Sequence, residues 1–172
     1  MNIKIIPVGY LKTNCYILTK NNKTIVIDPG DEAEKIINEI EGDVIGIIIT
    51  HHHFDHVGAL KTLKTKYNVP IIDYNNQLVL SPFNYHIIET KGHSDDSITI
   101  YFEKEKIMFC GDFIFQDTIG RTDLPTGNII EMKKSIKNLL TMDESIMLYP
   151  GHYEKTSIRE EKDNLKNILK FY

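Results

Sequence analysis

The chain has 172 residues, enough for one domain with its own hydrophobic core, and we expect residues 1–172 to form a single domain. Its formal net charge of −4 argues against a nucleic-acid partner, which would need an extended basic face. The sequence shows no signal-peptide pattern and no apolar run of about 20 residues. We therefore expect no membrane partner and a cytoplasmic location, and the oligomeric state stays open.

The first third of the chain predicts strands around one helix. Short β-branched or apolar runs separated by turn residues indicate strands at 3–9, 14–19, 24–30 and 43–50. The last of these is almost continuously apolar, so we expect it to be buried on both faces. A helix is predicted over 31–42, with Asp31 as its cap and Glu34 three positions later. Its apolar stripe consists of Ile36, Ile37 and Ile40.

The remaining chain repeats the alternation of helices and strands. Helical patterns occupy 56–67, 129–140 after the N-cap candidate Asn128, and 157–172. The last helix is amphipathic, with apolar positions at Ile158, Leu165, Ile168 and Leu169. Further strands are predicted at 69–73, 85–90, 97–103, 106–112 and 145–152. Strands and helices that alternate in two successive halves predict an α/β domain in which helices cover two packed sheets.

Four of the seven histidines lie within residues 51–56, between a predicted buried strand and a predicted helix. If the chain leaves the strand still extended, His51 and His53 point the same way and His52 points elsewhere. Asp55 and His56 follow at the start of the helix, where the turning backbone can aim both at a neighbouring position. Neutral imidazole and carboxylate are ligands that Zn²⁺ and similar metals accept.

Three more polar residues follow predicted strands further along the chain. His93, Asp112 and His152 each come after an apolar run and lie beside a glycine. Strand ends at a rigid sheet edge are places where side chains from distant segments can meet. His86 has no such setting, and we expect it at the surface.

The residues "HHHFDH" at 51–56 fit the H-x-H-x-D-H motif of the metallo-β-lactamase superfamily. His93, Asp112 and His152 fit the remaining ligands of that superfamily in the expected order. The resemblance covers nearly the whole chain, from "TNCYIL" to "YPGH". It implies an α/β fold, the four-layer αββα sandwich, with two packed mixed sheets flanked by helices.

The resemblance also implies a ligand set for two divalent metal ions. One ion would be held by His51, His53, His93 and Asp112. The other would be held by Asp55, His56, His152 and again Asp112, which bridges. Nitrogen and oxygen ligands without thiolate accept zinc, which is the default, and also iron or manganese.

Such a metal pair indicates hydrolysis of a small molecule. Two cations about 3.5–4 Å apart lower the pKa of a shared water to about 7, and the resulting hydroxide is the nucleophile. Asp55 is the catalytic candidate that orients it. The motifs offer no obvious general acid, which favours a thioester, because a thiolate leaves without prior protonation. The segment "GRTDLPTGN" resembles glyoxalase II-like hydrolases, which implies a hydroxyacylglutathione hydrolase-like thioesterase.

Two departures from the family pattern are visible. Asp95 and Asp96 replace the usual proline and glycine after the third histidine. We expect them to form a solvated turn, and the alternative is that one of them contacts metal or substrate. The sequence continues for 20 residues after His152, whereas full-length glyoxalase II enzymes add a helical domain that binds glutathione. The resemblance therefore extends to thioester chemistry and not to glutathione recognition.

Several assignments stay open. Arg121 and Tyr153 are candidates for substrate binding, although Arg121 could instead pair with Asp123 and Tyr153 could simply pack. Asp28 either stabilises its turn or accepts a hydrogen bond from a ligating histidine. Cys110 fits a buried small hydrophobe.

Two other functions compete with hydrolysis. One is a mono-iron persulfide dioxygenase that would use His51, His93 and Asp112. The other is a metal-binding protein without turnover.

Overall fold

A computed structural model describes residues 1–171 of the chain. The fold divides into two compact units, unit 1 over Met1–Asn84 and unit 2 from Tyr85 onward. Each unit contains a five-stranded mixed sheet and its own helices. None of the helices within residues 1–171 combines the length and apolar character of a membrane span. The expectation of a single domain over 1–172 stays a prediction.

Unit 1 is a mixed sheet with three helices. Its strands, in spatial order, are β1 (Asn2–Val8), β2 (Thr13–Lys20), β3 (Lys23–Ile27), β4 (Asp43–Ile48) and β5 (Ile71–Ile72). β1, β2 and β3 pair antiparallel, whereas β3, β4 and β5 pair parallel. Its helices are α1 (Ala33–Glu39), α2 (Phe54–Val57) and α3 (Leu60–Tyr67).

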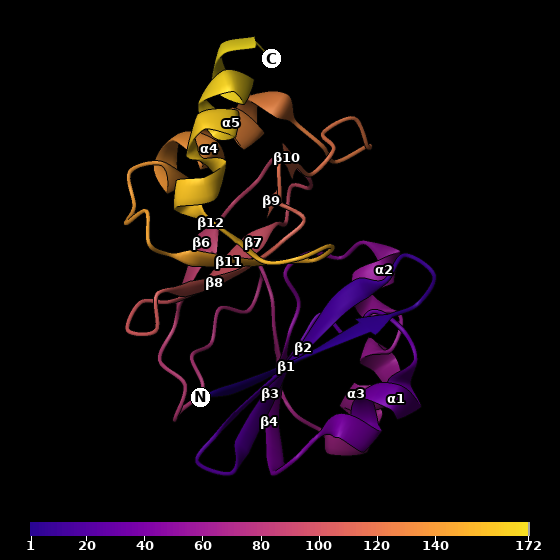
Figure 1. Cartoon of the computed structure of the whole chain (residues 1–172). Coiled ribbons are helices and arrows are strands. Elements are labelled where there is room, and N and C mark those ends of the chain that lie inside the picture. The colour runs from indigo at the N-terminus through magenta and orange to yellow at the C-terminus, as the bar shows by residue number, and fades with distance from the viewer. Residues whose placement is uncertain (172) are drawn as a thin grey trace. The chain divides into compact units, whose positions relative to one another are not determined.

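Helices α1 and α3 cover one face of this sheet (Figure 1). Ile36 of α1 and Leu63 of α3 are fully buried, in one apolar cluster with side chains of the first four strands. Ile47 and Ile48, which point to opposite faces of β4, are both fully buried. The prediction of a strand buried on both faces is thus confirmed for the second half of β4.

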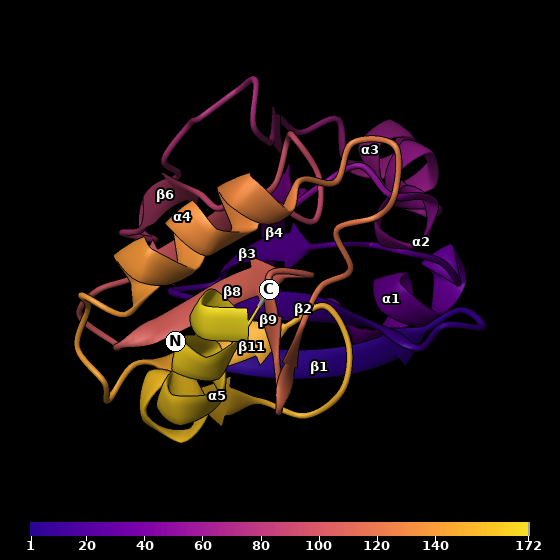
Figure 2. The same cartoon turned by 90° about the horizontal axis from the view of Figure 1, so that it is seen from above.

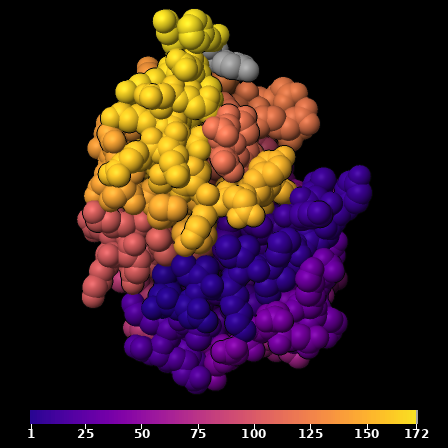
Figure 3. Space-filling view, in the orientation of Figure 1, coloured from indigo at the N-terminus to yellow at the C-terminus, as the bar shows by residue number. Residues whose placement is uncertain are grey.

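The parallel pairing of β3 and β4 sets up the start of the candidate site. The amide of Asp28 donates to the carbonyl of Ile48 at 3.0 Å, which continues the ladder past the end of β3. Residues that directly follow these two strands therefore lie side by side at one sheet edge. Strands β1 and β5 are the outer strands of this sheet, and Figure 3 shows the N-terminal part of the chain in deep indigo at the surface of unit 1.

Two local predictions in unit 1 are wrong. The helix expected over 56–67 is divided into α2 and α3, because the backbone at Gly58 and Ala59 packs against the turn at Pro29 and Gly30. Asp31 does not cap α1. Its carboxylate accepts from the adjacent amide of Glu32, which is itself the N-cap residue, in the left-handed region.

Unit 2 repeats the pattern of a sheet with helices on one face. Its main sheet has the spatial order β12 (Thr156–Ser157), β11 (Met147–Pro150), β8 (Ile107–Gly111), β7 (Ile98–Phe102) and β6 (His86–Glu89). A separate short hairpin, which the sequence did not predict, consists of β9 (Ile114–Phe115) and β10 (Thr118–Ile119). The helices are α4 (Ile129–Leu139) and α5 (Ile158–Phe171).

Helices α4 and α5 pack on the sheet of unit 2 along β8 and β11 (Figure 2). Ile136 of α4 and Leu165 of α5 are fully buried in one cluster with Met108 and Leu148 of these strands. Asn128 caps α4 as predicted, since its side chain accepts from two backbone amides of the first turn. The parallel strands β8 and β11 end together, so the residues that follow them lie at one edge.

Candidate metal centre

The first donor pair lies in the loop that follows β4. His51 Nε2 and His53 Nδ1 are 3.1 Å apart, and the two rings meet edge to face. His52 points elsewhere, with Nε2 3.5 Å from Asp73 Oδ2 at the surface. The predicted alternation of the three histidines is present in unit 1.

The second donor pair lies on the short helix α2. His56 is fully buried, and its Nε2 is 3.6 Å from Asp55 Oδ2. The hydroxyl of Thr13, at the start of β2, donates to the same Asp55 oxygen at 2.9 Å. The four predicted donors of unit 1 therefore form two adjacent pairs.

Hydrogen bonds to Asp28 position both donor pairs. Its Oδ2 accepts from His56 Nδ1 at 2.9 Å and from the Thr50 hydroxyl at 2.7 Å, and its Oδ1 accepts from the Thr50 amide at 2.8 Å. Thr50 in turn contacts His51 Nδ1 at 3.3 Å. Asp28 adopts a φ of 50°, a conformation that aspartate tolerates better than most residues. Of the two roles considered for Asp28, the hydrogen bond with a candidate ligand histidine is present, and it leaves Nε2 of His56 as the nitrogen available to a metal.

Two glycines let α2 approach the turn after β3. A Cβ on Gly30 would lie 1.8 Å from the carbonyl oxygen of Asp55, and one on Gly58 would lie 2.2 Å from the carbonyl oxygen of Gly30. Larger residues would force the backbone apart at both positions. The requirement for glycine arises from contacts between residues that are 25 or more positions apart in the sequence, so no local sequence pattern predicted it.

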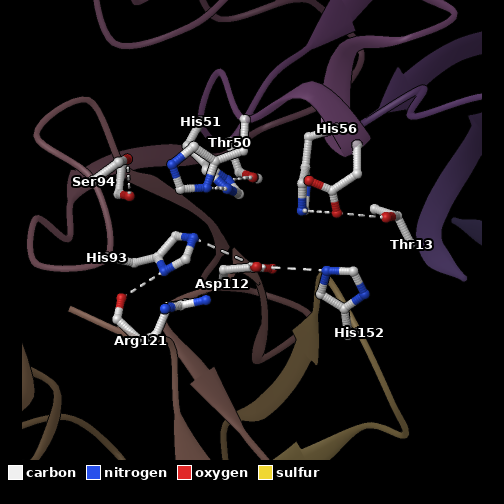
Figure 4. A network of polar contacts seen from close by, with 12 residues as sticks. Thr13, Thr50, His51, His56, His93, Ser94, Asp112, Arg121 and His152 are labelled. Carbon is white, nitrogen blue, oxygen red and sulfur yellow. Dashed lines mark hydrogen bonds and ion pairs between the residues drawn. The ribbon is translucent and has the colours of Figure 1, made fainter. Parts of the chain in front are cut away.

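Unit 2 contributes one carboxylate between two histidines (Figure 4). Asp112 Oδ2 lies 3.5 Å from His93 Nε2 and 3.5 Å from His152 Nε2. Asp112 follows β8, His152 follows β11, and His93 lies in the loop between β6 and β7. The two predicted histidine donors of unit 2 therefore both lie beside one carboxylate oxygen of the third donor, Asp112.

His93 is oriented by the backbone of the 120–128 segment. Its Nδ1 donates to the carbonyl oxygen of Arg121 at 2.8 Å, which leaves Nε2 toward Asp112. A Cβ on Gly120 would lie 1.8 Å from the Asp112 carbonyl oxygen and 3.1 Å from the His93 ring. The segment that resembles glyoxalase II-like hydrolases thus contacts the site through its main chain.

The donor chemistry of both units fits divalent metal ions. Two nitrogens bound to one tetrahedral ion at about 2.0–2.1 Å stand roughly 3.3 Å apart, close to the 3.1 Å between His51 Nε2 and His53 Nδ1. His56 and His93 each engage one ring nitrogen with a carboxylate or carbonyl, as metal-ligating histidines almost always do. The residues present are therefore suitable for such a centre.

The guanidinium of Arg121 forms a bidentate pair with Asp123, with N–O distances of 2.8 and 2.7 Å. Hydrogen bonding from Arg121 lowers the pKa of Asp123 to about 2. The alternative pairing considered for Arg121 is therefore present. Tyr153 is 73% exposed beside His152.

The other open assignments have structural answers. His86 is exposed, 3.4 Å from Glu103, as predicted. Cys110 is buried in the apolar cluster of unit 2. Asp96 accepts from the Ser94 hydroxyl at 2.6 Å within its turn, while Asp95 is exposed, so the expected turn role is confirmed for Asp96.

The sequence pattern described as "Metallo-beta-lactamase superfamily" matches residues 8–79 and 77–152. The chain belongs to this superfamily. A member from Haemophilus influenzae, named hydroxyacylglutathione hydrolase GloC, is 32% identical over 94% of this chain and 95% of its own. Relatives at about this level of identity thus include proteins with hydrolase names.

Similar solved structures confirm the α/β fold with two mixed sheets and helices. The BLEG-1 B3 metallo-beta-lactamase is 28% identical, with a TM-score of 0.87 over 94% of this chain and 97% of that one. TTHA1623, solved in a di-iron-bound form, is 26% identical, with a TM-score of 0.82 over 94% of this chain and 98% of that one. Superfamily membership indicates divalent metal binding, and the di-iron neighbour shows that a protein of this fold can hold iron, so membership does not specify which metal is bound.

Proposed function

We propose that this chain is a metal-dependent hydrolase of small thioesters or esters, similar to hydroxyacylglutathione hydrolases. The observation that carries the proposal is the position of Asp112, whose Oδ2 lies 3.5 Å from both His93 and His152. A single oxygen equidistant from two imidazoles suits a carboxylate that bridges two ions. A mono-iron site would need no such bridge, and so we favour hydrolysis over persulfide oxidation.

The proposed ligand assignment divides the donors of each unit between two ions. The first set is His51, His53, His93 and Asp112, and the second set is Asp55, His56, His152 and Asp112. Support comes from the pairing of donors within unit 1, where His51 contacts His53 and Asp55 contacts His56. When bound, two divalent cations activate a water as nucleophile and polarise the substrate carbonyl.

The chain's own residues would orient the reactants. The Thr13 hydroxyl donates to Asp55 Oδ2 and so fixes the orientation of the carboxylate. The other oxygen of Asp55 would then accept a proton from the attacking water. Asp28 and the carbonyl of Arg121 keep His56 and His93 in fixed tautomers. Tyr153 and Arg121 are the proposed substrate contacts. The Asp123 pair engages two of the five N–H groups of the guanidinium, and Tyr153 offers an exposed ring.

Metal content and thioester hydrolysis, measured on the same preparation, test this proposal. We expect about two metal ions per chain, with zinc as the default, and turnover of N-acetylcysteamine thioesters that a chelator abolishes. One iron per chain together with oxygen consumption on glutathione persulfide would replace the hydrolase by the dioxygenase. Tight metal binding without turnover of any ester or thioester in a broad panel would favour the non-enzymatic alternative.

A matched pair of histidine variants separates the site from the surface. His93→Ala removes a proposed ligand, whereas His86→Ala removes an exposed histidine of the same unit. We expect His93→Ala to lose metal and to lower kcat/KM by at least about a hundredfold, because binding and chemistry fail together. The His86→Ala variant should match the wild type in both measurements.

A small molecule in the cytoplasm is the proposed reaction partner. Cys15 and Cys110 are both buried thiols outside any disulfide, which is compatible with a reducing compartment. Fractionation of cells that express the natural protein, with a periplasmic marker as control, tests the location.

A further inference from the structure

A hollow of about 300 Å³ opens in unit 1 beside Asp55. The loop between β1 and β2 supplies Tyr10 and Leu11 to its wall, and the start of α2 supplies Phe54. Asp31 lines it next to the turn after β3. The hollow is thus formed within one unit, from two loops and the first turn of a helix.

The apolar side chains around this hollow are unusually exposed. Tyr10 is 97%, Phe54 76% and Leu11 46% exposed. Isolated exposed apolar residues are common, but three that line one hollow form a patch of the kind that marks a binding site. Gly30 and Gly58 also line the hollow, where the turn after β3 and α2 lie in close backbone contact.

Asp55 connects the hollow to the proposed reaction. Its side chain is 14% exposed, and it belongs to the second ligand set. A ligand in the hollow therefore lies next to the place where the substrate carbonyl would react. A thioester extends from that carbonyl in two directions, toward the thiol and toward the acyl group.

We propose that this hollow binds the acyl group of the substrate, and that Tyr10, Leu11 and Phe54 select uncharged apolar acyl groups. The inference rests on the proposed hydrolase function. Among the lining residues, the charged side chain outside the proposed ligand set is the acid Asp31, which repels an acyl group that carries its own carboxylate. The volume is at the lower end of the range for ligand sites and exceeds the roughly 150 Å³ cavity that holds a benzene molecule. Short branched aliphatic or single-ring aromatic acyl groups fit this space.

A binding experiment tests the subsite without any turnover. The sequence contains no tryptophan, so Tyr10→Trp places a single indole at the hollow. The metal-loaded variant is titrated with S-benzyl-N-acetylcysteamine, a thioether that cannot be hydrolysed, and with its 4-carboxybenzyl twin. We expect a saturable change in emission with the benzyl compound and at least about tenfold weaker binding of the carboxylate.

The matched control places the indole on another exposed apolar position. Ile130 on α4 is 64% exposed and lies in unit 2, so Ile130→Trp should report no saturable change. Equal responses at the two positions, or equal affinity for the two thioethers, would overturn the proposal.

A kinetic experiment tests selectivity on acetyl, benzoyl and succinyl thioesters of N-acetylcysteamine. We expect wild-type kcat/KM to be highest for benzoyl and lowest for succinyl. Tyr10→Ala and Phe54→Ala should each lower the benzoyl value about tenfold and the acetyl value less than about twofold. Ile130→Ala is the control, and metal content is measured on each variant because Phe54 adjoins His53 and Asp55.

The outcomes separate this inference from the hydrolase proposal. A uniform loss on all three thioesters, or no loss on any, would reject the subsite while hydrolysis stands. If the wild type cleaves no thioester, the hydrolase proposal fails, and the fluorescence titration still decides whether the hollow binds apolar groups.

Discussion

The imidazole Nδ1 of His56 donates to Asp28 Oδ2 at 2.9 Å, and both side chains are almost completely buried. Because a carboxylate only accepts, this contact fixes the tautomer of His56 and leaves Nε2 for a metal. The same carboxylate also accepts from the amide and hydroxyl of Thr50. One side chain therefore aligns the loop after β4 with the helix α2.

The first prediction concerns Asp28→Asn. Asparagine tolerates the φ of 50° at this position, but its amide group presents donors where three donors already converge. We expect metal affinity to fall about 10–100-fold and the free energy of unfolding to fall by about 1–3 kcal/mol. Metal titration and urea unfolding measure the two effects. Asp43→Asn, in an exposed pair with Lys23, serves as control, and unchanged metal affinity in Asp28→Asn would contradict the role assigned to this contact.

The second prediction concerns Gly120→Ala. The added Cβ would lie 1.8 Å from a backbone oxygen of Asp112, so the backbone must move rather than a flexible side chain. We expect a loss of about 1–3 kcal/mol in unfolding free energy, as for other overpacked sites, together with weaker metal binding. Thr118→Ala, at an exposed position of the adjoining strand β10, should change neither free energy by more than about 0.5 kcal/mol. Wild-type stability in Gly120→Ala would show that the segment is free to shift.

The third prediction concerns Arg121→Gln and follows from the pKa of Asp123. The variant should return the pKa of Asp123 from about 2 toward 3.8, which NMR titration of the carboxyl carbon can measure. The folded pKa is depressed, so the pair contributes stability above pH 3.8 and loses it as the pH falls toward 2. Metal content should stay at the wild-type level, because His93 binds the backbone oxygen of residue 121. A rise in KM with unchanged kcat would indicate that the guanidinium also contacts substrate, and loss of metal would contradict the backbone assignment.

The fourth prediction concerns Cys15, whose thiol is fully buried. Burial raises the pKa of this thiol well above its ordinary value of 9.0, and the nearby charge of Asp28 adds to the effect. Stability is therefore fully present below pH 9 and falls above it, as the thiol ionises in the unfolded chain alone.

Comparison with Cys15→Ala isolates this contribution. Above pH 9.0, the ordinary pKa that the thiol has in the unfolded chain, we expect the difference in unfolding free energy between wild type and variant to shrink by about 1.4 kcal/mol per pH unit. Urea unfolding at pH 8 and pH 10 measures it, and a parallel pH dependence of the two proteins would contradict it. Ellman's reagent should detect the two thiols of the wild type only after unfolding, because both are buried.

The sequence by itself determined which residues can act as donors and where along the chain they lie. His51, Asp112 and His152 each follow an apolar strand. Such strands can be recognised from the pattern of a few neighbouring residues. The cap at Asn128 and the buried face of α5 were readable for the same reason. Local chemistry and local pattern are sufficient for such predictions.

Tertiary structure alone decided how each donor is held. The hydrogen bond from His56 to Asp28 spans 28 positions, and so does the one from His93 to the Arg121 carbonyl. The break between α2 and α3 depends on the contact of Gly58 with Gly30 across a similar distance in sequence. These features arise from atoms that meet only when strands pair and helices pack, so no window of neighbouring residues contains the information that specifies them.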